Sequence, residues 1–204
     1  MGELSAMSGW ELLAVLLSIT YLVLAMRQNL WCWYAAFVST SIFLFLFWNV
    51  NLLMDSALQI YYLAMAVYGW YQWKYGHLNG NDDSEGVPIH RWDLRQHSLA
   101  IGAVVIAALI SGVFLQKNTD AAWPFVDSFT TWGAVLTTWM VTRKVLENWL
   151  YWIVIDAVSV ALYWDRGLYL TSLLFVAYVV ICIFGWFNWQ RQLREEPELV
   201  PQQG

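Results

Sequence analysis

The chain has 204 residues, of which 60% are hydrophobic and 12% are charged, and its formal net charge is −5. Soluble domains carry about 25% charged and about 45–50% apolar residues, so this composition excludes an ordinary soluble domain and favours an integral membrane protein. It also excludes a disordered chain and a basic face for nucleic acid. The two cysteines give neither a disulfide framework nor a metal-ligand spacing.

Seven continuous apolar runs follow in chain order, each about 17–22 residues long, the length that a helix needs to cross a hydrocarbon core about 30 Å thick. They cover residues 10–26, 31–48, 56–73, 98–115, 125–142, 148–164 and 168–189. Because the runs do not alternate between apolar and polar residues, they predict helices rather than a β-barrel. The predicted fold class is therefore an all-α integral membrane protein with seven transmembrane helices.

The charges of the connecting segments predict the orientation. If seven helices alternate in direction, one face receives eight of the ten Lys and Arg residues, and the other receives Lys117 and Arg166. Cytoplasmic loops carry the positive excess, so the N-terminus is expected outside and the C-terminus inside. Residues 76–96, which include the polar stretch 79–86, are predicted as a flexible cytoplasmic loop, and residues 192–204 as a cytoplasmic tail.

An internal repeat relates the two ends of the chain. A shift of 116 residues gives 13 identities over the 47 positions from 27 to 73, where chance would give roughly three or four. The units are residues 8–75 and 125–191, each with three helices, and residues 97–117 form a linker transmembrane helix. Since three helices plus one is an even number, both units run in the same direction. Such parallel repeats are typical of transporters that bind substrate between the repeats near the bilayer midplane.

Asp156 is the charged residue at the middle of a predicted helix. A charge at this depth costs about 2.5–3.5 kcal/mol, so Asp156 must face protein or water and have a partner. Asn148, Trp152, Ser159 and Tyr163 share its helical face. Two interpretations remain open at this point, a pocket lining or an interhelical hydrogen-bond network that fixes the packing.

The third and seventh runs add polar and aromatic side chains at similar depth. Gln59 and Tyr62 share one face of the third run, with Gln72 near its cytoplasmic end, and Trp186 and Asn188 lie together on the seventh. Rings beside amides and a carboxylate favour a small, planar, polar substrate that carries a positive charge. No nucleotide-binding, nucleophile-elbow or metal-ligand motif is present, so the sequence predicts no enzyme, metal or cofactor.

Three segments resemble the PnuC family of vitamin B3 transporters: VYGWYQW at residues 67–73, ENWLYWIVID at 147–156, and the stretch from GLY at 167–169 to GW at 185–186. The resemblance covers roughly residues 10–191. It implies a 3+1+3 fold related to the SWEET sugar transporters, nicotinamide riboside as substrate, and a homotrimer in the lipids of the bacterial inner membrane. It also implies facilitated diffusion by alternating access, with uptake driven by a cytoplasmic riboside kinase that traps the riboside by phosphorylation.

The predicted substrate-binding residues lie in or next to these segments, except for Gln59 and Tyr62, which come from the helical-face argument. They are Gln59, Tyr62, Trp70, Gln72, Asn148, Tyr151, Trp152, Asp156, Trp186 and Asn188. Family members that carry riboflavin or thiamine share much of the pattern. Two alternatives therefore stay open: a proton-coupled carrier of such a vitamin, in which Asp156 gains and loses a proton, and a non-transporting membrane receptor module.

Overall fold

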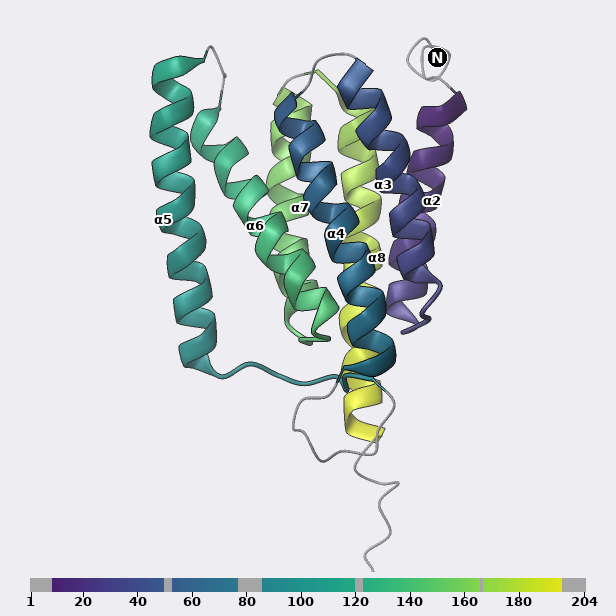
Figure 1. Ribbon diagram of the computed structural model, residues 1–204. Helices are drawn as coiled ribbons and strands as arrows, with labels where there is room; N and C mark the ends of the chain where they lie inside the picture. The colour runs from purple at the N-terminus through teal and green to yellow at the C-terminus, as the bar shows by residue number, and fades with distance from the viewer. Residues whose placement is uncertain (1–8, 50–52, 77–85, 120–122, 166, 196–204) are drawn as a thin grey trace, which may run out of the picture.

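The computed structural model describes residues 9–49, 53–76, 86–119, 123–165 and 167–195. Within them lie seven α-helices, one for each predicted run (Figure 1). They are α2 (Gly9–Met26), α3 (Cys32–Asn49), α4 (Leu53–Tyr75), α5 (Leu94–Asn118), α6 (Pro124–Thr142), α7 (Asn148–Asp165) and α8 (Tyr169–Glu195). The prediction of an all-helical fold with seven helices is confirmed for the described residues.

α5 and α8 extend furthest beyond their predicted runs, and their polar ends are capped or paired. α5 begins at Leu94 rather than at 98, since the carboxylate of Asp93 accepts a hydrogen bond from the Gln96 amide at 2.7 Å. The Gln96 side chain accepts in return from the Asp93 amide at 2.9 Å, which completes a capping box. α8 continues past residue 189 to Glu195, where Arg191 pairs with that glutamate at 2.6 Å.

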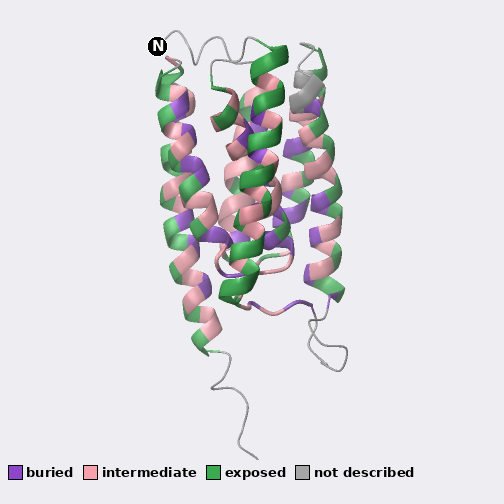
Figure 2. Cartoon of the chain, turned by 90° about the vertical axis from the view of Figure 1, so that its left-hand side faces the viewer, coloured by how far each residue is buried: buried purple, intermediate pink, exposed green. Residues whose placement is uncertain are grey.

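Six helices close into a ring. α2 packs against α3, α3 against α4, α4 against α6, α6 against α7, α7 against α8, and α8 returns to α2. α5 stands outside the ring against α6 (Figure 1), and its apolar side chains Leu99, Ile106 and Ile110 are exposed. Figure 2, which views the molecule from the α5 side, shows the buried residues gathered inside the bundle and toward its lower end.

By length and composition alone, three helical segments among the described residues are apolar enough to span a membrane. They are Gly9–Met26, Leu94–Asn118 and Thr171–Glu195, and Cys32–Leu46 is a shorter apolar helix. The remaining helices of the ring carry more polar side chains, several of which are buried, such as Thr137 and Thr142 on α6. The polar side chains that face the inside of the ring therefore lower the mean hydropathy of the helices that carry them.

The ends of α2 and α6 have the same geometry at positions 116 residues apart. Gln28 and Lys144, which follow these helices, both adopt left-handed backbone, with φ of 52° and 53°. In each case the amide of the next residue donates to a carbonyl of the last helical turn, at 2.9 and 3.0 Å. This is the Schellman type of helix end, and it turns the chain directly into α3 or α7.

Two glycine–tryptophan contacts match across the same shift. A Cβ built on Gly69 of α4 would lie 2.4 Å from the ring of Trp33 on α3. A Cβ built on Gly185 of α8 would lie 2.6 Å from the ring of Trp149 on α7. Only glycine lets these helix pairs approach so closely with an indole between them.

Residues 86–93, which we call the strap, cross the end of the bundle at the α6–α7 turn (Figure 1). His90 forms an isolated parallel bridge with Val145: its amide donates to Lys144 at 3.2 Å, and its carbonyl accepts from Leu146 at 2.8 Å. Val87 and Ile89 are buried. This part of the predicted flexible loop is thus packed, because its alternating apolar side chains enter the core; residues 77–85 and 196–204, in the predicted loop and tail, lie outside the described residues.

Candidate substrate site

Asp156 lies midway along α7 and faces the inside of the ring. Its side chain is 4% exposed, and its Oδ2 accepts a hydrogen bond from the thiol of Cys182 on α8, with 3.9 Å between sulfur and oxygen. The buried face of α7 also carries Asn148, Ile155 and Ser159. The helical-face argument from the sequence therefore agrees with the burial of Asn148, Asp156 and Ser159.

One thiol and two tyrosines from other helices interact with this carboxylate. Tyr62 on α4 and Tyr178 on α8 are near enough to Asp156 to interact with it electrostatically. Tyr21 on α2 is similarly near Tyr62 and the two cysteines. We call these six residues the central cluster: Tyr21, Cys32, Tyr62, Asp156, Tyr178 and Cys182. They come from five of the six ring helices, so ring closure itself assembles them.

Within the described residues, the side-chain hydrogen bond to Asp156 comes from the thiol of Cys182. A thiol is a weak donor, and no Lys or Arg lies in the middle of any of the seven helices. A carboxylate in such surroundings is stabilised by a ligand that brings a positive charge or several hydroxyl groups. The arrangement is suited to binding such a ligand.

Two further predicted residues lie on α7 toward the α6–α7 turn. Asn148 is completely buried, and its Nδ2 donates to the Val145 carbonyl at 2.7 Å. Its Oδ1 has no hydrogen-bond partner within the described residues. Trp152 is half-buried and packs against the hydrophobic core. Asn148 thus keeps one acceptor atom available inside the ring.

Two other predicted residues bind neighbouring elements of the protein instead. The hydroxyl of Tyr151 lies 2.8 Å from Nδ1 of His97 on α5, and the two rings stack at 5.8 Å. Nδ2 of Asn188 donates to the Met26 carbonyl at the end of α2, at 3.0 Å. The structure therefore places Tyr151 and Asn188 at helix–helix contacts and not beside Asp156.

The remaining predicted residues lie on α4 and α8. Gln59 is half-buried, and the backbone carbonyl of Gln72 accepts from the strap at Val87. The guanidinium of Arg91, also on the strap, lies 6.0 Å from the ring of Trp186. Trp186 is thus covered from the side on which the strap lies.

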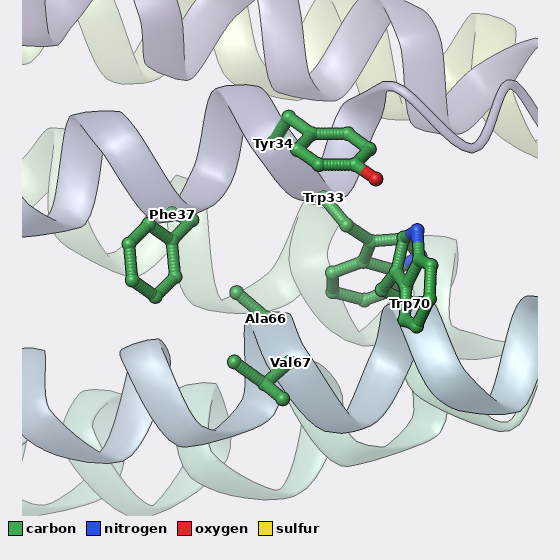
Figure 3. A pocket seen from close by; sticks show the side chains of 6 residues that line it. All are labelled: Trp33, Tyr34, Phe37, Ala66, Val67 and Trp70. Carbon is green, nitrogen blue, oxygen red and sulfur yellow. The ribbon is translucent and has the colours of Figure 1, made fainter.

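Trp70 lines an apolar groove of about 400 Å³ between α3 and α4 (Figure 3). The lining consists of Trp33, Tyr34, Phe37, Ala66, Val67 and Trp70. Of these, Tyr34, Phe37 and Val67 are exposed, so the groove opens outward from the ring. It lies within one predicted repeat, whereas the sequence predicts a binding site between the two.

Sequence reasoning did not select Tyr21, Cys32, Tyr178 or Cys182 as site residues. The sequence does place Tyr178 and Cys182 on one face of the seventh run, together with Gly185 and Trp189, although they are not among the ten predicted binding residues. Tyr21 and Cys32 carry no such local signal, since their place in the central cluster depends on the contact of α2 with α8.

A closed ring of helices around a buried polar centre, with apolar side chains exposed outside, is the architecture of a multi-pass membrane transporter. The comparison with known proteins identifies the group. The model of the nicotinamide mononucleotide transporter family matches residues 8–191, and the chain belongs to this family. It is a family of bacterial transporters and not of enzymes.

Two curated relatives and one solved structure resemble the chain over most of its length. The riboflavin/roseoflavin transporter RibM of Streptomyces davaonensis is 27% identical over 91% of this chain and 86% of its own length. The nicotinamide riboside transporter PnuC of Escherichia coli is 23% identical over 84% of this chain and 81% of its own. A crystal structure of the vitamin B3 transporter PnuC has a TM-score of 0.70 and 20% identity, covering 90% of this chain and 81% of that one. The last comparison shows that the fold is PnuC-like.

Proposed function

We propose that the protein transports nicotinamide riboside across the bacterial inner membrane. The observation that carries this proposal is the carboxylate of Asp156, buried at the centre of the ring with a thiol as its hydrogen-bond partner. Nicotinamide riboside is a cation, with a pyridinium ring, an amide and ribose hydroxyls. A buried carboxylate balances the charge, and neighbouring tyrosine rings stabilise a flat cation through their faces.

Riboflavin is the second candidate substrate. The relative named for it matches more of this chain, at higher identity, than the Escherichia coli relative named for nicotinamide riboside. Riboflavin is uncharged, and its ribityl hydroxyls would donate hydrogen bonds to Asp156. Charge therefore separates the two candidates: removal of the carboxylate charge harms binding of the cation more than binding of the neutral flavin.

We also propose that all seven helices cross the membrane, as two parallel three-helix repeats joined by α5 in the SWEET-related 3+1+3 arrangement. The matching helix ends at Gln28 and Lys144 and the matching glycine–tryptophan contacts support the repeat. Eight of the ten Lys and Arg residues belong to the face of the α6–α7 turn. This supports a cytoplasmic C-terminus and an external N-terminus.

The proposed mechanism is facilitated diffusion by alternating access. The sequence has no nucleotide-binding motif, so the energy for net uptake comes from outside this chain. A cytoplasmic riboside kinase supplies it, because phosphorylation gives the product a charge that this site does not accept. A homotrimer is part of the same proposal.

Counterflow uptake into liposomes tests the proposed substrate. Vesicles preloaded with nicotinamide riboside should accumulate radiolabelled riboside, and excess unlabelled riboside should compete more strongly than riboflavin or thiamine. Stronger competition by riboflavin would replace nicotinamide riboside with riboflavin as the substrate. Binding without counterflow would favour a receptor module.

A pH gradient across the same vesicles tests for proton coupling. Facilitated diffusion predicts that the riboside reaches equal concentrations on both sides, whatever the gradient. Accumulation that follows the gradient would instead make Asp156 a proton-carrying group in a coupled carrier.

A further inference from the structure

Four tryptophans form a row across the ring at the end that the strap covers. Trp33 on α3 meets Trp73 on α4 edge-to-face, with ring centroids 5.3 Å apart. Trp149 on α7 meets Trp189 on α8 in the same way, at 5.4 Å. Trp73 and Trp189 lie 6.0 Å apart and join the two pairs. All four are at most 5% exposed, so this tryptophan row fills the ring at its level.

The two inner tryptophans are bonded across the boundary between the proposed repeats. Nε1 of Trp73 donates to the carbonyl of Val141 on α6 at 3.0 Å. Nε1 of Trp189 donates to the carbonyls of Ala25 and Met26 on α2, both at 3.1 Å. Val141 and Ala25 are themselves 116 residues apart, so the bonds to these two carbonyls are equivalent. Carbonyls in the last turn of a helix have capacity for such extra donors.

The two outer tryptophans are held differently. Within the described residues, Nε1 of Trp33 and Nε1 of Trp149 have no hydrogen-bond partner. Their rings are instead fixed by close contact with Gly69 and Gly185 of the same repeat. Each outer tryptophan therefore belongs firmly to its own repeat, whereas each inner one also binds the other repeat.

The row lies between Asp156 and the strap. Along α7, Trp149 precedes Asp156 by two helical turns, about 10 Å. Along α8, Trp189 follows Cys182 by the same distance of about 10 Å. A ligand beside Asp156 must therefore pass the level of the row to reach the face with the α6–α7 turn.

We propose that the tryptophan row is the cytoplasmic gate, and that it opens between Trp73 and Trp189 when their indole hydrogen bonds to the opposite repeat break. This inference rests on the alternating-access transport proposed above. Opening breaks the Trp73–Trp189 ring contact, the indole hydrogen bonds of both residues and the Asn188–Met26 hydrogen bond. The pairs Trp33–Trp73 and Trp149–Trp189 stay intact within their repeats. Because contacts are tight within each repeat and fewer between the repeats, the two repeats can move as rigid bodies.

Thiol labelling of Cys182 tests the gate without requiring any transport. The chain has two cysteines, so Cys32→Ala leaves Cys182 in the central cluster as the single thiol. In this parent, Trp73→Phe or Trp189→Phe keeps an aromatic ring and removes one indole donor. A membrane-impermeant maleimide is applied to one face at a time, and protease access to the C-terminal tail identifies the face.

The gate predicts changes of opposite sign at the two faces. Each variant should label about fivefold faster than the parent from the tail face, as expected for loss of one net hydrogen bond. Labelling from the other face should become slower, because a shift toward the inward-open state depopulates the outward-open one. Unchanged labelling rates would overturn the proposal. Faster labelling from both faces would also overturn it, because it would indicate that the whole helix bundle packs less tightly.

Two pairs of matched variants serve as controls. Trp33→Phe and Trp149→Phe alter the same row but remove no hydrogen bond, so they should leave the two rates nearly unchanged. Trp48→Phe and Trp164→Phe alter exposed tryptophans at the opposite ends of α3 and α7. If one inner variant fails to fold, the equivalent inner variant carries the test. Opposite-signed labelling without riboside counterflow would uphold the gate and refute only the proposed substrate.

Discussion

The thiol of Cys182 on α8 and the carboxylate of Asp156 on the neighbouring helix α7 face each other, with 3.9 Å between sulfur and oxygen. At the positions related by the 116-residue shift stand Ala66 and Thr40, neither of which carries a charge. Among the described residues, the buried carboxylate at this level therefore belongs to one repeat. This makes Asp156 the residue whose alteration best separates the candidate substrates.

Asp156→Asn should reduce nicotinamide riboside transport strongly and riboflavin binding weakly. Loss of an interaction with a charged group costs about 1.5–3 kcal/mol, which is about 10- to 100-fold in affinity. Riboside counterflow measured over a range of substrate concentrations provides the test. Asp165→Asn is the control, because this exposed carboxylate lies at the end of the same helix and accepts from Trp123 at 3.1 Å. Equal effects of the two substitutions would remove Asp156 from the site.

Gly69→Ala and Gly185→Ala should each destabilise the folded protein. The added methyl groups would overlap the rings of Trp33 and Trp149, and overpacking of this kind costs about 1–3 kcal/mol. Thermal unfolding in detergent measures the effect as a lower Tm. Gly102→Ala on α5 is the matched control, because nothing lies within 4 Å of its added Cβ. That substitution should leave Tm unchanged or raise it, since alanine favours helix more than glycine does.

Tyr151→Phe should lower stability without changing the apparent KM for substrate. It removes the hydrogen bond to His97 that ties α7 to α5, at a cost of about 1 kcal/mol, and leaves the stacked ring in place. Tm and counterflow kinetics of the same preparation separate the two effects. A raised KM with an unchanged Tm would instead place Tyr151 in the substrate site, as the sequence motif predicts.

The strap should bind the bundle less firmly in acid because of His90. Burial lowers the pKa of His90 below its ordinary value of 6.5. The folded state therefore binds fewer protons than the unfolded state, and stability is present above about pH 6.5 and lost as the pH falls below it. Between about pH 7.5 and pH 5.5 the Tm of the parent should fall more than that of His90→Gln. Parallel Tm changes in the two proteins would contradict this.

The helices and the most important polar residue were predictable from local signals. Continuous apolar runs of spanning length define the seven helices. Asp156 stands out because a carboxylate at membrane depth is energetically costly and is retained where it has a function. The helix ends were harder to predict from the sequence, because the capping box at Asp93 and Gln96 lies outside the apolar part of α5. Gly69 and Gly185 each pack closely against a tryptophan ring. The repeat of glycine and tryptophan after 116 residues therefore preserves the same close helix contact in both repeats.

The rest of the central cluster depends on which helices are neighbours. Tyr21 joins it because α2 closes the ring against α8, a contact between the two ends of the chain that no periodicity encodes. Tyr151 contacts His97 because α5 lies outside the ring, beside α6. A sequence motif indicates that a residue has a defined role, whereas the arrangement of the helices determines whether that residue contacts a ligand or another helix.

The twofold likeness of the backbone contrasts with the unlike side chains that it carries, Asp156 against Thr40 and Asn148 against Cys32. A ligand turned end for end between the two halves would lose its anionic counterpart and the free amide oxygen of Asn148. The proposed site therefore predicts a single pose for nicotinamide riboside, with its charged ring on the α7 half. In the proposed alternating-access cycle, the other half would then move away first.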